Sequence, residues 1–406
     1  MKLEISFALR RVLPALAIPL IWSASALVYL GKTPYDVRSH DAAPHVYYTL
    51  FIRQHHRLPN PQSGWETYQP PLYYLLNSVM PGPPADHIRR VRYLSVLLGA
   101  LSLLMMWAAL GEKRISRATR VAVLAFVASI PKYYFVFTTY NNDALAVPLA
   151  MLTILCAYVT VRTSHLKWAA IMALVGVAAI HTKYDAAVPI ALVSGAAVWL
   201  WRRGDVSARQ CCLVVGASGI ALLSILPYFY WHNYLRAHEL VVTNFNWSDR
   251  ILGRASWENL LRVSFGRPYW KTPFTLYTNN FWLYSFISTV FGESDLSKEM
   301  TVFLCWVLIA LHLLIKILAL IWSRRERFTS LVAAIIIAAF FAPIPLMILH
   351  PQFRLADYRY LAWGWMLWAL LLGSWLEVAG RLKWPRLIPV AAATAIQVFG
   401  WARLSF

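Results

Sequence analysis

The stretch "RSHDAAPHVYY" at residues 38–48 places a carboxylate and an imidazole close together. Asp41 and His45 are four residues apart, so their side chains share one face if the stretch is helical. A carboxylate in such a place can take the proton of an attacking hydroxyl, and a neighbouring histidine can help to bind the substrate. Two structural roles stay open, which are a helix N-cap for Asp41 and a packed, hydrogen-bonded side chain for His45.

Further polar groups follow near the ends of later apolar runs. They are Tyr68 and Gln69 in "WETYQPPLYYLL", Arg89 and Arg92 in "HIRRVRYLS", Asn142 and Asp143 in "TTYNNDALA", Lys183 in "HTKYDA", and Arg359 and Tyr360 in "DYRYLAW". Two acids and several cations around one cavity would suit an anionic substrate and a proton acceptor. Capping of a helix by Asp143 and snorkelling of Lys183 and Arg359 are the alternatives.

The elements that must position these residues are membrane helices. The 406 residues are 59% hydrophobic and 14% charged, whereas soluble domains carry about 25% charged residues. Solid apolar runs of membrane length recur along the chain, which favours helices over a barrel. We therefore predict an all-α polytopic membrane protein with eleven spans, near 12–30, 91–110, 121–139, 144–160, 168–181, 186–201, 210–230, 299–322, 330–349, 360–378 and 387–403.

The net charge of +20 is explained by the topology of the spans. If the N-terminus is cytoplasmic, every inner loop is basic, as the positive-inside rule requires. These loops carry Lys113, Arg114, Arg117 and Arg120; Arg162 and Lys167; Arg202, Arg203 and Arg209; Arg324, Arg325 and Arg327; and Arg381, Lys383 and Arg386. The charge therefore gives no reason to expect nucleic-acid binding.

The outer side of the predicted protein has two long segments, at 31–88 and 231–298, which are rich in aromatic residues and hold most of the acids. We expect them to fold, with short helices, over a single transmembrane domain that spans residues 1–406, and we expect 31–88 to be the catalytic loop. The four cysteines, Cys156, Cys211, Cys212 and Cys305, have no metal-binding spacing.

The motifs occur in an order that resembles a known superfamily. "D-x-x-x-H-x-x-Y", "YQPPLYYLL", "NNDALA", "TKY" and "RYL" follow one another between residues 41 and 361, and "FWLYSFISTVFG" lies at 281–292. This set is similar to the GT-C superfamily of polyprenyl-phosphate-dependent glycosyltransferases, which includes the protein O-mannosyltransferases and the lipid A aminoarabinose transferase. One departure is Asp41-Ala42, because many relatives have a second acid directly after the first.

The resemblance implies an inverting glycosyltransferase of the bacterial inner membrane, with its active site facing the periplasm or exterior. The donor would be a polyprenyl-phosphate sugar, the acceptor a glycan, lipid or protein, and Asp41 the general base. Lys183, Arg359 and one or more of Arg89, Arg90 and Arg92 would hold the phosphate, while Asp143 would orient the acceptor or bind a divalent cation, Mg²⁺ or Mn²⁺. His45, Tyr68, Gln69, Asn142 and Tyr360 complete the expected substrate site.

Two other functions remain open from the sequence. A transporter or flippase of lipid-linked saccharides would also need a polar cavity, but would place polar groups near the bilayer midplane. In this chain the motif residues concentrate at the outer ends of the spans, which favours an enzyme. A non-catalytic partner in glycan assembly is the second alternative, and it predicts that loss of Asp41 has no effect.

Overall fold

The structure is a computed structural model that describes residues 2–36, 41–242, 281–291, 300–324, 327–341, 358–380 and 386–405. These residues form helices and short connections, and no β-strand occurs among them. A helix satisfies its own backbone hydrogen bonds, so it is stable in a bilayer without a partner strand. The predicted all-α class is confirmed.

The helices of the described residues have the following bounds. They are α1 (Lys2–Lys32), α2 (Ala42–His55), α3 (Leu72–Ser78), α4 (Pro84–Glu112), α5 (Arg117–Ser129), α6 (Pro131–Thr138), α7 (Asp143–Thr163), α8 (Leu166–Ile180), η1 (Tyr184–Ala186), α9 (Ala187–Arg202), α10 (Ala208–Leu223), α11 (Leu226–Tyr228), η2 (Phe229–Tyr234), α12 (Leu235–Ala237), α16 (Phe281–Phe291), α17 (Val302–Ser323), α18 (Arg327–Phe341), η4 (Tyr358–Gly364), α20 (Trp365–Gly380) and α21 (Leu387–Ser405).

The polytopic membrane character follows from length and composition. Within the described ranges, 6 helical stretches are long and apolar enough to cross a membrane, and α5 with α6 adds a seventh if this bent pair is one span. Each of the eleven predicted ranges contains helix, although some helices are short for a span, such as α8 with 15 residues. The count of eleven spans stays a prediction.

A proline breaks the helical run between α5 and α6. Pro131 is the first residue of α6, and the two helix axes differ by 66°. Proline has no N–H group and its ring clashes with the preceding turn, so a helix that reaches it ends or bends. The bend brings the next two side chains, Lys132 and Tyr133, into the interior of the bundle, where both are buried.

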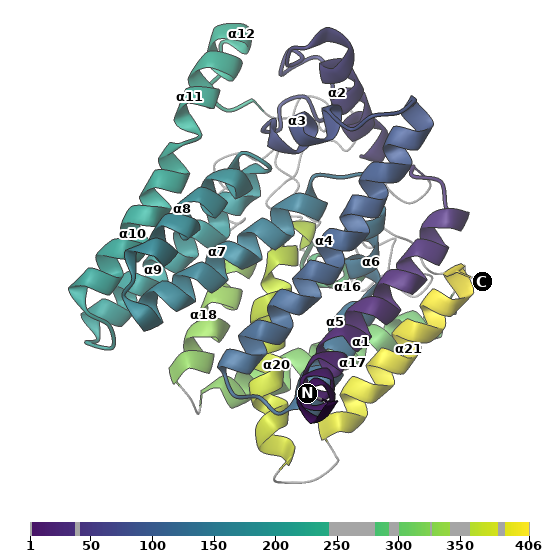
Figure 1. Ribbon diagram of the computed structural model, residues 1–406, viewed down its shortest axis with the longest axis vertical. Coiled ribbons are helices and arrows are strands. Elements are labelled where there is room, and N and C mark those ends of the chain that lie inside the picture. The colour runs from purple at the N-terminus through teal and green to yellow at the C-terminus, as the bar shows by residue number, and fades with distance from the viewer. Residues whose placement is uncertain are drawn as a thin grey trace.

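The membrane helices pack into two neighbouring groups. The larger core joins α1, α4, α5, α6, α16, α17, α18, α20, α21 and the first part of α7, and a smaller one joins the later part of α7 with α8, α9 and α10. Figure 1 shows α8, α9 and α10 at one edge of the bundle and α1 and α21 at the other. The helix α16, from the predicted second outer segment, packs against α6, α17 and η4 and buries Ile287, Val290 and Phe291.

The first outer segment folds over one end of the bundle. In Figure 1, α2 and α3 lie together at the end where α11 and α12 project, whereas the N-terminus lies near the opposite end. Tyr48 of α2, Tyr73 and Tyr74 of α3, and Tyr140 between α6 and α7 form a shared buried cluster. The polar residues of 41–78 therefore lie where several membrane helices end.

Candidate functional site

Asp41 directly precedes α2, but its side chain does not cap the helix. It precedes the helix, and its carbonyl accepts a hydrogen bond from the His45 N–H at 3.1 Å, so the two residues lie on one face as predicted. Its side chain makes no capping hydrogen bond. Instead, the Trp65 indole Nε1–H donates to Asp41 Oδ1 at 3.0 Å, and the carboxylate is fully buried. Capping of α2 therefore does not account for the buried Asp41 carboxylate.

His45 of α2 lies against two tyrosines of α3, Tyr73 and Tyr74. Its Nδ1 is 2.8 Å from the Tyr74 hydroxyl, and the Tyr74 ring stacks on Tyr48 at 3.8 Å between centroids. Burial raises the pKa of Tyr74, and the nearby Glu66 carboxylate raises it further. The Tyr74 hydroxyl therefore stays protonated and can donate to His45 Nδ1, and this contact fixes the orientation of the imidazole.

The segment before α3 is anchored through its backbone. Tyr48 and Tyr228 both donate their hydroxyls to the Gln69 carbonyl, at 3.3 and 3.1 Å, and Tyr184 donates to the Tyr68 carbonyl at 2.9 Å. Two prolines follow Gln69 and offer no N–H group, so side chains take the place of backbone pairing here. Three helices thus fix the position of Tyr68 and Gln69.

A buried ion pair lies at the start of α7. Lys183 Nζ contacts Asp143 Oδ1, both side chains are 5% exposed, and Asp185 lies 3.6 Å from the same ammonium. The Asn141 side chain caps α7 by accepting from the Ala144 N–H at 3.1 Å. Asp143 is therefore the first residue of α7 and not its cap. The positive end of the helix dipole stabilises its negative charge.

Tyr73 links this ion pair to the Asp41 side of the site. Its ring centroid lies 6.5 Å from that of His45 and 5.9 Å from that of Tyr140. Burial raises the pKa of Tyr73, and the Asp143 charge contributes in the same direction. The backbone directly before Tyr73 is also held in place, because the Leu72 N–H donates to the carbonyl of His181 at 2.9 Å.

Other predicted residues reach this region to different degrees. The Asn142 side chain donates to the Thr182 carbonyl at 3.4 Å, beside Lys183. Trp363 of η4 lines a small cavity with Asp143 and Asp185, so the helix that contains residues 359 and 360 approaches the ion pair. The side chains of Arg359 and Tyr360 lie outside the described residues, and so does residue 357.

The two predicted arginines of α4 have separate environments. Arg92 is buried and donates to the carbonyls of Thr138 and Thr33, at 2.7 and 3.0 Å, so it joins the ends of α1, α4 and α6. The Arg89 side chain is 60% exposed and pairs with Asp86 at 2.7 Å. The structure thus holds Asp41 and His45 against Trp65 and α3, and it holds Asp143, Lys183 and Asn142 together at the start of α7. Tyrosine side chains fix Tyr68 and Gln69, while Arg92 is buried at the ends of α1, α4 and α6 and Arg89 lies on the surface.

Comparison with protein families indicates the class of protein. Residues 69–231 match the family model of dolichyl-phosphate-mannose-protein mannosyltransferase. No curated protein gives a significant match to the chain. The family match confirms the resemblance to the GT-C superfamily and supports a membrane glycosyltransferase. It spans α3 to η2 and includes Asn142, Asp143 and Lys183, while Asp41 and His45 precede it.

The surroundings of Asp143 fit an ammonium group better than a metal ion. Its Oδ1 contacts Lys183, and the described residues contain no group of three or more His, Cys, Asp or Glu side chains with metal-binding geometry. Hard divalent cations need several oxygen ligands. No step is therefore assigned to a metal here, and a divalent cation at Asp143 stays a prediction.

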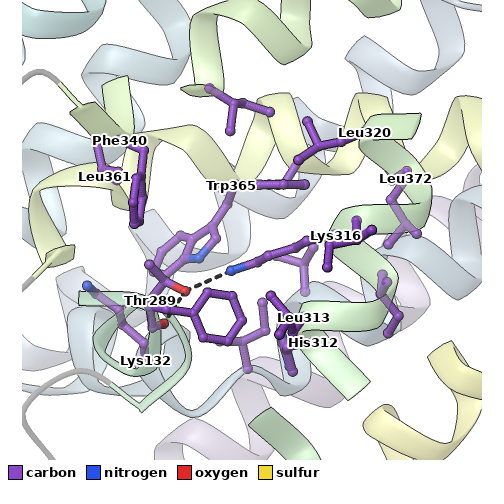
Figure 2. Close-up of a pocket in the computed structure, with 18 of the residues that line it drawn as sticks. Lys132, Thr289, His312, Leu313, Lys316, Leu320, Phe340, Leu361, Trp365 and Leu372 are labelled. Atoms are coloured by element: carbon purple, nitrogen blue, oxygen red, sulfur yellow. Dashed lines mark hydrogen bonds between the residues drawn. The ribbon is translucent and has the colours of Figure 1, made fainter. Parts of the chain in front are cut away.

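Sequence reasoning gave too little weight to three parts of the structure. Glu66 is 3% exposed and close enough to Tyr74 to raise its pKa, so a second buried acid of the first outer segment lies near the tyrosine that contacts His45. Trp65 binds Asp41 directly. Lys132 and Lys316 line a cavity inside the helix bundle (Figure 2). The sequence signal for these two lysines is that each stands alone in an apolar run, Lys132 in "PKYYFV" and Lys316 in "LLIKIL".

Proposed function

We propose that the protein transfers a sugar from a polyprenyl-phosphate donor to an acceptor hydroxyl, with inversion, at the outer face of a bacterial inner membrane. The observation that carries the proposal is the placement of Asp41. This carboxylate is buried directly before α2 and accepts a hydrogen bond from the Trp65 indole. One turn later, the His45 ring lies 6.5 Å from the Tyr73 ring, and the Asp143 charge is close enough to Tyr73 to raise its pKa. The family match supports the reaction class.

In the proposed reaction the acceptor hydroxyl attacks the anomeric carbon of the donor. Asp41 takes the hydroxyl proton as the new carbon–oxygen bond forms, and it becomes a neutral carboxylic acid. The bond from the anomeric carbon to the phosphate oxygen breaks, and its electron pair leaves with the polyprenyl phosphate. Attack from the side opposite the leaving group inverts the anomeric configuration. The proton then passes from Asp41 to solvent.

The phosphate that leaves needs positive partners. Lys183 is the best-placed cation of the described site, but Asp143 and Asp185 already contact it, so its charge is balanced in the free protein. We propose that Asp143 holds Lys183 in position and that a donor phosphate draws the ammonium toward itself. Arg359 is a second candidate, since its helix approaches the ion pair. Arg92 would contribute by holding α4 in place through its hydrogen bonds to the carbonyls of Thr33 and Thr138.

The direct test is sugar transfer by purified protein with a synthetic polyprenyl-phosphate sugar and candidate acceptors. Asp41→Asn keeps the shape of the side chain but removes the base, and we expect the turnover rate to fall about a hundredfold to ten-thousandfold. Asp36→Asn is the matched control, because Asp36 is an exposed acid of the same outer segment. Wild-type turnover by Asp41→Asn would exclude Asp41 as the base.

A flippase of lipid-linked saccharides remains the second candidate because of one observation. Lys132 and Lys316 line a cavity between helices in the apolar part of the bundle, where a transporter would need polar groups. Reconstituted vesicles separate the two functions. A flippase moves the labelled donor across the bilayer with no acceptor present and releases no polyprenyl phosphate, whereas a transferase releases polyprenyl phosphate only when an acceptor is added.

A further inference from the structure

The loop of residues 58–69, between α2 and α3, is held at both ends by side chains of one distant helical segment. At its start, His232 Nε2 donates to the Pro59 carbonyl at 3.1 Å. At its end, the Tyr228 hydroxyl donates to the Gln69 carbonyl at 3.1 Å. Each of these bonds joins residues more than a hundred positions apart in the chain, so the loop is part of the tertiary structure and not a free connection.

The helical segment that supplies these donors contains a π-helical turn, η2, between α11 and α12. Tyr228, His232 and Arg236 follow one another at intervals of four residues, so their side chains lie on one helical face. Arg236 Nη1 also reaches the loop and donates to the Leu58 carbonyl at 3.2 Å. π-helical turns are rare and occur frequently at functional sites. Here the segment around η2 presents three donors to one loop.

The loop is closed by hydrogen bonds of its own as well. The Thr67 hydroxyl is 1% exposed with its side chain and accepts from the Gly64 N–H at 2.9 Å. The same hydroxyl can donate to the carbonyl of Pro61 or Gly64, at 3.1 and 2.9 Å. Trp65 lies inside this closed turn, so its backbone has a fixed position from which the indole can reach out.

Two consecutive residues of the loop reach both members of the pair on the α2 face. The Trp65 indole Nε1–H donates to Asp41 Oδ1 at 3.0 Å. The buried Glu66 lies close to Tyr74, whose hydroxyl is 2.8 Å from His45 Nδ1. A displacement of this loop would therefore disturb the surroundings of Asp41 and His45 together.

We propose that Trp65 is the positioning residue of the Asp41 carboxylate. A hydrogen bond to one carboxylate oxygen restricts the rotation of the group and favours its ionised form. An indole is a donor only, so Trp65 orients the base and takes no part in the proton transfer itself. The consequence for sugar transfer rests on the proposed function, whereas the effect of the indole on the carboxylate does not.

The first experiment measures the contact between Trp65 and Asp41 without any substrate. In the full chain labelled with ¹⁵N-tryptophan, the indole N–H resonance of Trp65 is assigned by its loss in Trp65→Phe. Asp41→Asn should move this proton resonance to higher field, because a charge-assisted hydrogen bond becomes a neutral one. Asp36→Asn is the control and should leave the resonance in place, since Asp36 is exposed. An unchanged resonance in Asp41→Asn, or an equal change in Asp36→Asn, overturns the positioning of Asp41 by Trp65.

The second experiment measures sugar transfer by Trp65→Phe, in which a ring remains but the donor is lost. The turnover rate should fall about tenfold to hundredfold with a nearly unchanged KM for the donor, because the base loses its orientation while the donor site is kept. The acidic limb of the pH–rate profile should move to higher pH, since a carboxylate that loses a hydrogen-bond donor takes up a proton more readily. Partial unfolding would lower the rate at every pH and would leave this limb in place.

The matched control is Trp201→Phe, because Trp201 of α9 is 46% exposed, and this variant should transfer sugar at the wild-type rate. A wild-type rate and pH profile in Trp65→Phe, or an equal loss in Trp201→Phe, overturns the positioning role. Absence of transfer by the wild-type chain contradicts the proposed function instead, and the Trp65 resonance then still decides whether the indole positions Asp41.

Discussion

Single residues in this protein carry charge at positions where charge is costly. Asp143 and Lys183 are the clearest case, because both side chains are 5% exposed and each contacts the other. A buried pair gains little net stability over an apolar pair, because desolvation offsets most of the attraction. Its retention here is consistent with a function in substrate binding, where a charge must be available at a fixed place.

The prediction for this pair concerns stability and activity separately. Lys183→Met should lower the free energy of unfolding by about 3–5 kcal/mol, since the Asp143 charge stays buried without the ammonium. Asp143→Asn should cost less, because Asp185 still lies 3.6 Å from the Lys183 ammonium. The double variant should recover part of that loss. If the pair binds substrate, the double variant recovers stability but not sugar transfer. Unfolding in detergent and the transfer assay measure the two effects.

The matched control is the exposed pair of Arg162 and Glu112, whose side chains are 56% and 45% exposed. Glu112→Gln should change stability by about 1 kcal/mol or less, because surface pairs are screened by solvent. Recovery of both stability and transfer in the Asp143→Asn, Lys183→Met double variant would show that the buried pair is only structural.

Helices of this bundle approach one another most closely where glycine replaces a side chain. At Gly99 of α4, a Cβ atom would lie 2.8 Å from Phe137 Cγ and would also meet the Trp22 ring. The Tyr133 hydroxyl donates to the Gly99 carbonyl at 2.6 Å, so the bent pair α5–α6 is held at the same point. One small residue thus sets the spacing of three elements.

Gly99→Ala should therefore lower the free energy of unfolding by about 1–3 kcal/mol through overpacking. Gly195→Ala is the matched control, since a Cβ at Gly195 of α9 meets nothing within 4 Å. The control should be neutral or more stable by up to about 1 kcal/mol, because alanine is the better helix former. Equal melting temperatures for the two variants would contradict the close packing at Gly99.

At the scale of the whole molecule, orientation in the membrane rests on the distribution of basic loops. Arg202 ends α9, and Arg203 and Asp205 follow in the turn to α10, while the segment between α2 and α3 lies at the end of the bundle opposite the N-terminus. The positive-inside rule places the first of these in the cytoplasm and the second outside.

Cysteine labelling in intact cells tests this orientation. With the exposed Cys212 replaced by serine, a membrane-impermeant maleimide should label Gln62→Cys directly, and should label Asp205→Cys only after the membrane is permeabilised. Gln62 and Asp205 are both exposed, so access to the reagent differs only by side of the membrane. The reverse labelling pattern would place Asp41 in the cytoplasm and would exclude the proposed donor chemistry.

Much of this protein was predictable from its sequence because the bilayer restricts what a chain can do. Apolar runs of membrane length must be helices, so the all-α class and the helical ranges followed from composition alone. That Asp41 and His45 share a helical face followed from their spacing of four residues, and the hydrogen bond from the His45 N–H to the Asp41 carbonyl agrees with it. The order of short motifs was sufficient to indicate the superfamily that residues 69–231 match.

Other features depend on contacts between distant residues and were decided only by the tertiary structure. Trp65 is 24 residues from Asp41, and Thr289 is 27 residues from Lys316, so no local pattern could pair them. The sequence placed the ionisable residues at one membrane face, whereas the 66° bend at Pro131 turns Lys132 into the bundle. Helical periodicity determines which residues share a face, but the packing of faces determines which of them meet.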